Sequence, residues 1–228
     1  MKKILLATTI LVGSASFAAA DVSFSGEGGF GVKSTTGGPW RVYHDLQLDI
    51  AFSGTTDGGL EFGAEWTIKQ ANAHNNRDVE LFISGDFGKV TVGEKANVTY
   101  IGYEHSFGDF SFEATYRPIP ATWNVELGYD FGDYDVYLKH ASSGVTGIGG
   151  NAEFGDFTLG LEIKNVSLAS TTWEATAGWS SGAISVDATV GAGNAWKLEA
   201  GYDLGGGAVV EASFDNLRTY SLGVAMEF

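Results

Sequence analysis

Hydrophobic and polar residues alternate one by one along most of this chain. In residues 41–52 the even positions, from Val42 to Phe52, are mainly apolar, whereas the odd positions include Asp45 and Asp49. Because successive side chains of a strand point to opposite faces, this period of two predicts strands with one apolar and one polar face. The same period recurs in residues 60–69, 110–116, 123–130, 157–163, 184–190, 196–202 and 220–228. It is unclear in residues 98–106 and weak in residues 148–154.

A short turn motif recurs between these segments. Phe-Gly-Asp occurs at residues 107–109, 131–133 and 154–156, and a related Gly-Asp lies at residues 85–86. Gly-Asp suits a two-residue hairpin turn, and the aromatic residues beside several of these turns fit a girdle at a membrane interface. Further turns at residues 55–59, 180–182 and 204–207 bring the total to seven on one edge.

Seven turns on the edge that also holds both termini separate eight hairpins. The sequence therefore predicts an all-β fold, a transmembrane antiparallel up-and-down β-barrel of 16 strands. The alternative is 14 strands, if residues 148–154 and one neighbouring segment do not form strands. A soluble β-sandwich or a secreted barrel would also show the alternation.

The first 20 residues have the features of an export signal. Lys2 and Lys3 precede a short apolar stretch, and Ala18, Ala19 and Ala20 supply small residues for cleavage. That stretch is too short to span a bilayer as a helix. We expect residues 1–20 to be a signal peptide and residues 21–228 to form one outer-membrane barrel.

Composition narrows the possible functions. The whole chain has a net charge of −15, and loss of Lys2 and Lys3 makes the mature chain about two charges more negative. Such an acidic chain, without a basic cluster, is a poor candidate for nucleic-acid binding. Cysteine is absent, which excludes disulfides and thiolate metal sites. After residue 20 no apolar run is long enough for a membrane helix, so a membrane-spanning fold must be a closed barrel.

Several segments resemble a known family. Residues 53–64, residues 81–90 with Gly93 and Glu94, and residues 202–208 are similar to hairpins of Rhodobacter-type porins of alphaproteobacteria. The chain also ends on an aromatic residue, Phe228, as outer-membrane barrels of Gram-negative bacteria do. The resemblance implies a homotrimeric, 16-stranded channel for small hydrophilic solutes. It also implies contact with lipid and lipopolysaccharide of the cell outer membrane.

One feature departs from that family. In Rhodobacter-type porins a long third external loop folds into the lumen and forms the constriction. Here only Lys95, Ala96 and Asn97 separate the fifth predicted strand from the sixth, which begins near Val98. Three residues are too few to reach the pore centre. We therefore expect a wide aqueous lumen or one that is narrowed by another element.

If the apolar faces meet lipid, the opposite faces line the pore. Acidic residues outnumber basic ones on these faces, which predicts a mild cation preference. Arg41 and Arg117 are the basic residues expected to face an opposing carboxylate. The predicted pore-lining residues are Arg41, Asp45, Asp49, Glu61, Glu65, Lys69, Glu80, Lys89, Glu113, Arg117, Glu126, Lys139, Glu162, Lys197 and Glu199. The same faces are also expected to carry Asp135, Lys164, Glu174, Asp187, Glu211 and Glu227.

Other functions receive less support from the sequence. The tryptophans fall mostly near strand ends on the apolar face, as in an interfacial belt. The four histidines lack metal-ligand spacing, so no metal or other cofactor is predicted. An enzyme at the barrel rim would need to use His74 with Asp78, or His140 with Ser142 or Ser143, and we predict no catalytic residue. The main alternative to a porin is a non-conducting structural or adhesive barrel.

Overall fold

The computed structural model describes residues 8–9, 21–71, 74–165 and 171–228, with the side chains of residues 71–77 left outside the description. The predicted signal peptide therefore lies outside the described residues apart from Thr8–Thr9, which form strand β1 beside Ser23 and Phe24. The other strands are β2 (Asp21–Ser34), β3 (Arg41–Thr55), β4 (Glu61–Ala71), β5 (His74–Gly85), β6 (Gly88–Lys95), β7 (Val98–Phe107), β8 (Phe110–Arg117), β9 (Thr122–Asp130), β10 (Tyr134–Ala141), β11 (Thr146–Phe154), β12 (Phe157–Lys164), β13 (Thr172–Ser181), β14 (Ile184–Gly191), β15 (Ala195–Gly205), β16 (Ala208–Asp215) and β17 (Tyr220–Glu227).

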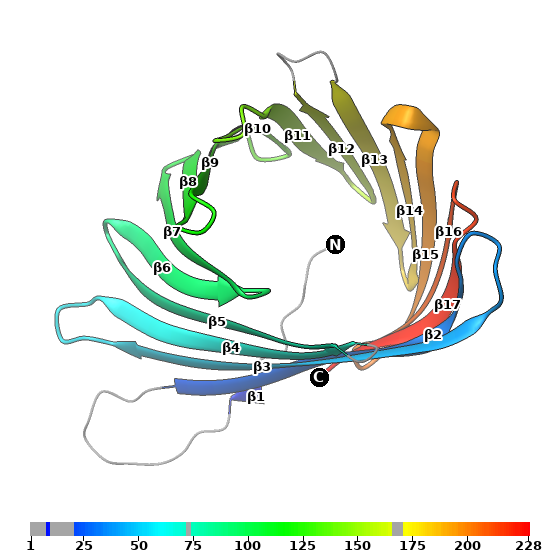
Figure 1. Ribbon diagram of the computed structural model, residues 1–228, viewed down its shortest axis with the longest axis horizontal. Coiled ribbons are helices and arrows are strands. Elements are labelled where there is room, and N and C mark those ends of the chain that lie inside the picture. Colours follow the sequence, from blue (N-terminus) through cyan, green and yellow to red (C-terminus); the bar gives the residue numbers. More distant parts are fainter. Residues whose placement is uncertain (1–7, 10–20, 72–73, 166–170) are drawn as a thin grey trace.

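Strands β2 to β17 form a closed antiparallel barrel. Each strand pairs with the next along the chain, and β17 pairs with β2 from Tyr220↔Ser34 to Glu227↔Glu27. The ring that results is visible in Figure 1, where β17 lies beside β2. Closure pairs the backbone groups that an edge strand would otherwise expose, which is the condition for crossing lipid with strands.

All seven predicted turns lie on one edge, which we call the turn edge. They follow β3, β5, β7, β9, β11, β13 and β15, and the same edge holds Asp21 and Phe228. In the Phe-Gly-Asp turns Gly108 and Gly155 have φ of 62° and 60°, a left-handed region that favours glycine. The predicted turn chemistry and the strand count of 16 are therefore confirmed.

The two segments with poor alternation are also strands. Residues 98–107 form β7, which pairs with both β6 and β8, and residues 146–154 form β11 between β10 and β12. The pattern of β11 is weak because Thr146, Gly150 and Ala152 occupy its outer face. In β7 the polar residues Thr99 and His105 face outward while Val98 and Tyr100 face inward. Pairing with one regular strand on each side holds these segments extended despite that pattern.

The opposite edge carries the connections that follow the even-numbered strands, from β2 to β16, and we call it the loop edge. The β6–β7 connection there is a two-residue turn at Ala96 and Asn97, whose φ values are 51° and 63°. Two consecutive positive φ values are typical of a type I′ hairpin turn, which matches the twist of the flanking strands. The predicted lack of a long third loop is therefore correct.

This barrel has no apolar core among its described residues. No hydrophobic side chain there is fully buried, and many large ones, such as Leu138 and Leu161, are close to half exposed. Apolar exposure on this scale over a whole outer surface indicates a surface that lipid covers. Among the described residues, no helix has the length and apolar character needed to cross a membrane.

Candidate functional site: the inner face of the barrel

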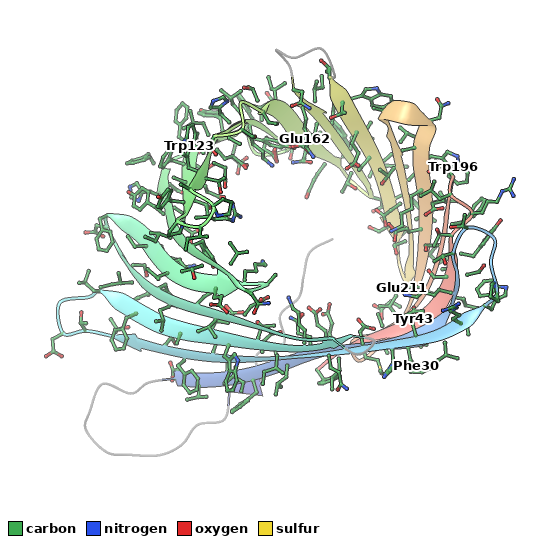
Figure 2. The ribbon with its side chains drawn as sticks, viewed as in Figure 1. Phe30, Tyr43, Trp123, Glu162, Trp196 and Glu211 are labelled. Carbon is green, nitrogen blue, oxygen red and sulfur yellow. The ribbon has the colours of Figure 1, made fainter. Side chains whose placement is uncertain are left out.

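The strand register divides the side chains into an inner and an outer face. Figure 2 shows Tyr43, Glu162 and Glu211 directed toward the inside of the ring. Residues paired directly across strands share a face, so each pairing extends this assignment to the next strand. Glu113, for example, opposes Glu104 on β7 and Glu126 on β9, and all three belong to the inner face.

The register places every predicted pore-lining residue on this inner face. That these residues line a conducting path stays a prediction. The residues are Arg41, Asp45 and Asp49 on β3, Glu61, Glu65 and Lys69 on β4, Glu80 on β5, Lys89 on β6, Glu113 and Arg117 on β8, Glu126 on β9, Lys139 on β10, Glu162 on β12, and Lys197 and Glu199 on β15.

Several inner-face charges were not predicted from the sequence. Glu104 was missed because β7 lacks clear alternation, although counting back from the Phe107–Phe110 hairpin places it opposite Glu113. Glu27 and Lys33 were missed because glycines interrupt the pattern of β2. The additional inner charges are Asp21, Glu27, Lys33, Asp78, Lys95, Glu104, Asp130, Glu153, Asp203 and Asp215.

A row of directly opposed charges crosses five strands of the inner face. It runs Lys89, Glu104, Glu113, Glu126 and Lys139, from β6 to β10. The two lysines at its ends form ion pairs, Lys89 Nζ with Glu104 at 2.9 Å and Lys139 Nζ with Glu126 at 3.3 Å. Glu113 at the centre makes no ion pair within the described part of the chain. Like charges in direct opposition are unfavourable in a dry sheet, so this row indicates a hydrated wall.

A second polar cluster supports the short β6–β7 turn. The Asp78 carboxylate accepts a hydrogen bond from the Ala96 backbone N–H at 2.9 Å and pairs with Lys69 Nζ at 3.2 Å. Next to it, the Tyr100 hydroxyl donates to Glu80. These bonds join β4, β5 and β7 to the turn and hold it against the wall.

Aromatic side chains of the inner face lie over glycines of neighbouring strands. A Cβ atom added at Gly31 would be 2.9 Å from the Tyr43 ring, and one at Gly223 would meet the Tyr43 hydroxyl. Tyr100 lies over Gly93 and Tyr137 lies over Gly149 in the same way. The glycines thus let these rings lie flat along the wall instead of projecting toward the barrel axis.

Two predicted details of the inner face are wrong. Neither Arg41 nor Arg117 forms an ion pair within the described residues, and Arg117 instead donates to the Asn124 side chain at 3.3 Å. Both arginines lie at the loop edge, where the residue opposite Arg41 is Lys33 on β2 and the residue opposite Arg117 is Thr122 on β9. Side-chain reach at a strand end is not visible in a pattern of alternation.

The outer face is apolar and carries aromatic residues near its two edges. Figure 2 shows Phe30, Trp123 and Trp196 directed outward. Trp123, Trp173 and Trp196 lie at the loop-edge ends of their strands, as the predicted belt requires, whereas Trp66 lies in the middle of β4. Within the described side chains, Glu94 is the one charged strand residue on this face.

The rim positions whose side chains the structure describes do not form a catalytic group. His140 Nδ1 is 2.8 Å from the Thr146 hydroxyl, and the Ser142 hydroxyl accepts a hydrogen bond from the Trp123 backbone N–H at 3.1 Å. His140 thus bonds a threonine and not a serine nucleophile, while the His74 side chain lies outside the described part. Within that part, no group of three or more His, Cys, Asp or Glu residues is placed to hold a metal ion.

Comparison with known proteins assigns the family. A family model described as Gram-negative porin matches residues 7–104 and 95–221. This chain belongs to the Gram-negative porin family. The predicted resemblance is therefore confirmed, and the family together with the barrel places this porin in the outer membrane, as predicted. Members of the family are channels, which confirms that the protein is not an enzyme.

One relative is similar to this chain in sequence, and two solved structures are similar to it in fold. This porin is 32% identical over 114 residues to a porin of Rhodobacter capsulatus, a match that covers 50% of the chain but only 36% of that porin. Its fold is similar to that of an engineered variant of the Rh. blastica porin, with a TM-score of 0.80 at 16% identity, covering 91% of this chain and 100% of the other. OmpT of Vibrio cholerae, solved as a trimer, has a TM-score of 0.73 at 11% identity, covering 92% and 100%.

Proposed function

We propose that this porin is a general-diffusion channel. Ions and small hydrophilic solutes pass through a water-filled, net acidic lumen, with a mild preference for cations. The observation that carries the proposal is the segregation of charge, because nearly all charged strand residues share the inner face while the outer face is apolar. The charged side chains need water inside the barrel, and the apolar side chains fit lipid outside it.

The short loop-edge turn supports free diffusion. The β6–β7 connection consists of Ala96 and Asn97, held to the wall through Asp78, so this connection does not cross the lumen. The aromatic side chains that lie flat over glycines also leave the space near the barrel axis free of their rings. A 16-stranded barrel without a plug leaves an aqueous channel, and an excess of carboxylates on its wall raises the local concentration of cations.

The test is single-channel recording in a planar bilayer, with the porin purified from outer membranes after expression of the full chain. A salt gradient should give steady steps and a reversal potential of the sign expected for cation preference. A reversal potential of the sign expected for anion preference would contradict the proposed cation preference. Absence of conductance from correctly folded, heat-modifiable protein would overturn the channel and favour a structural or adhesive barrel.

We also infer that the mature porin starts at Asp21 and assembles as a homotrimer in contact with outer-membrane lipid and lipopolysaccharide. The family resemblance supports both inferences, and the Vibrio cholerae OmpT was solved as a trimer. Native mass spectrometry of the detergent-extracted porin tests them together. The expected result is a protomer that lacks residues 1–20 in a complex of three. A monomer, or a protomer that retains Met1, would contradict the corresponding inference.

A further inference from the structure

The charges of the inner face are sorted along the barrel axis. We define the turn half as the inner positions that lie no more than four residues from the end of their strand at the turn edge. The remaining inner positions form the loop half. Lys89 is the one basic residue of the turn half among the described strands. The loop half holds the other basic residues, Lys33, Arg41, Lys69, Lys95, Arg117, Lys139, Lys164 and Lys197.

Acidic residues are distributed in the opposite way. The loop half has about as many acids as bases, and several are paired, such as Glu162 with Lys164 at 2.8 Å and Glu199 with Lys197 at 2.6 Å. The turn half holds a large excess of acids. They are Asp21, Glu61, Glu65, Glu104, Glu113, Glu126, Asp130, Asp135, Glu153, Asp187, Asp203, Glu211 and Glu227.

The connections at the turn edge add further negative charge next to the turn half. Five of the seven turn-edge connections carry an aspartate, Asp57, Asp86, Asp109, Asp133 and Asp156, and none carries a lysine or arginine. The internal segments outside the described part, residues 72–73 and 166–170, contain no charged residue. Almost the whole net negative charge of the mature chain therefore lies in the turn half and its rim, while the loop half is close to neutral.

We propose that this charge distribution makes the channel conduct ions asymmetrically. The inference rests on the proposed channel function. A cation-selective segment lies in series with a nearly non-selective one, and anions are rejected at the junction between them. When the field drives cations from the turn edge to the loop edge, anions moving the other way accumulate at the junction together with the arriving cations. The lumen then holds more carriers, and the current is larger.

The opposite field depletes the junction. Anions leave through the loop half, and the turn half supplies few to replace them, so the current is smaller. The effect requires the wall charge to act across the lumen, over a Debye length of about 10 Å at 0.1 M salt and about 3 Å at 1 M. Rectification should therefore be clear at low salt and weak at high salt.

The experiment is single-channel recording at both signs of voltage, in symmetric KCl at about 0.1 M and about 1 M. Because the chain has no cysteine, a Gly58→Cys substitution in the β3–β4 turn marks the turn edge. A biotin–maleimide followed by streptavidin, added to one side at the end of a recording, identifies which edge faces that side. The larger current is expected when cations flow from the turn edge to the loop edge.

Two matched triple variants locate the cause. E113Q/D187N/E211Q removes three acids of the turn half from β8, β14 and β16, and these acids form no ion pair within the described residues. D45N/E174Q/E199Q removes the same number from the loop half. The first variant should lower the rectification ratio toward one, and the second should preserve or increase it.

The outcomes separate the two proposals. A conducting channel with equal currents at both voltages and both salt concentrations would overturn the asymmetry and leave the porin function intact. Rectification in the reverse direction, or an equal response to the two triple variants, would also overturn it. Folded protein without conductance would overturn the porin function itself.

Discussion

At the scale of single residues, the inner wall depends on glycines as much as on charges. Tyr43 on β3 lies over Gly31 of the neighbouring strand β2 and over Gly223 of β17, the strand beyond it. A Cβ atom at Gly31 would meet the Leu222 backbone oxygen as well as the ring, and one at Gly223 would meet the ring hydroxyl and the Phe30 backbone oxygen, the latter at 2.7 Å. The tyrosine adds apolar and hydrogen-bonding surface to the sheet while the lumen beside it stays open.

The first prediction concerns this contact. Gly223→Val should displace the Tyr43 ring toward the axis, because the added side chain meets the ring hydroxyl, and it should strain the β2–β17 pairing, because its Cβ would lie 2.7 Å from the Phe30 backbone oxygen. We expect smaller single-channel conductance and a loss of stability on the order of 1–3 kcal/mol from overpacking. Conductance in planar bilayers and denaturant unfolding in lipid vesicles measure the two effects.

The control for this substitution is Ala225→Val, two residues along the same inner face and opposite Val209 and Gly29. It should change conductance less than Gly223→Val, since Ala225 already carries a Cβ atom at that position. Adding Tyr43→Ala to Gly223→Val should restore conductance, since the displaced ring is then gone. Unchanged conductance in Gly223→Val would contradict the proposed role of the contact.

At the scale of elements, the β6–β7 hairpin differs from its counterpart in Rhodobacter-type porins. Ala96 and Asn97 make a tight turn, and the Asp78 carboxylate on β5 holds it through the Ala96 N–H and Lys69. Asp78 is among the few buried polar residues of the described barrel, with 9% exposure. A buried carboxylate needs such partners, so the turn and Asp78 stabilise each other.

The second prediction concerns this support. Asp78→Ala removes the acceptor of the Ala96 N–H and the partner of Lys69. Hydrogen bonds to charged groups contribute roughly 1.5–3 kcal/mol, so local protection from hydrogen exchange should fall on the order of tenfold to a hundredfold. Hydrogen–deuterium exchange of peptides that cover residues 93–102 measures it.

Lys69→Met is the matched control, because it removes the ion pair but leaves the bond from the Ala96 N–H. Its effect on exchange should be clearly smaller. Equal protection in Asp78→Ala and the unmodified porin would show that strand pairing alone holds the turn in place.

At the scale of the whole molecule, charge and hydrophobicity are arranged in two directions. Across the wall, charged residues lie inside and apolar residues outside, which fits a barrel between water and lipid. Along the axis, all but one of the basic inner residues of the described strands lie in the loop half, and the turn half holds a large excess of acids. The first arrangement supports a channel, and the second supports the proposal that ions pass it more easily in one direction.

The sequence by itself was sufficient for the fold and for most of the inner wall. A period of two assigns each side chain to a face, and a turn motif between segments counts the strands, because both signals are local. This is why alternation alone correctly placed the predicted residues from Asp45 to Glu199 on the inner face. The short β6–β7 turn could be read in the same way, since it depends on the spacing between two strands.

Only the tertiary structure decided what depends on the register between strands. It placed Glu104 between Lys89 and Glu113, set Asp78 under the Ala96 turn, and left Arg41 and Arg117 without the carboxylate partners expected for them. It also revealed that the charges sort along the axis, because the distance of a residue from the turn edge is known only once each strand's ends are fixed. Alternation gives the face of a residue, whereas its height on the wall and its neighbours follow from barrel closure.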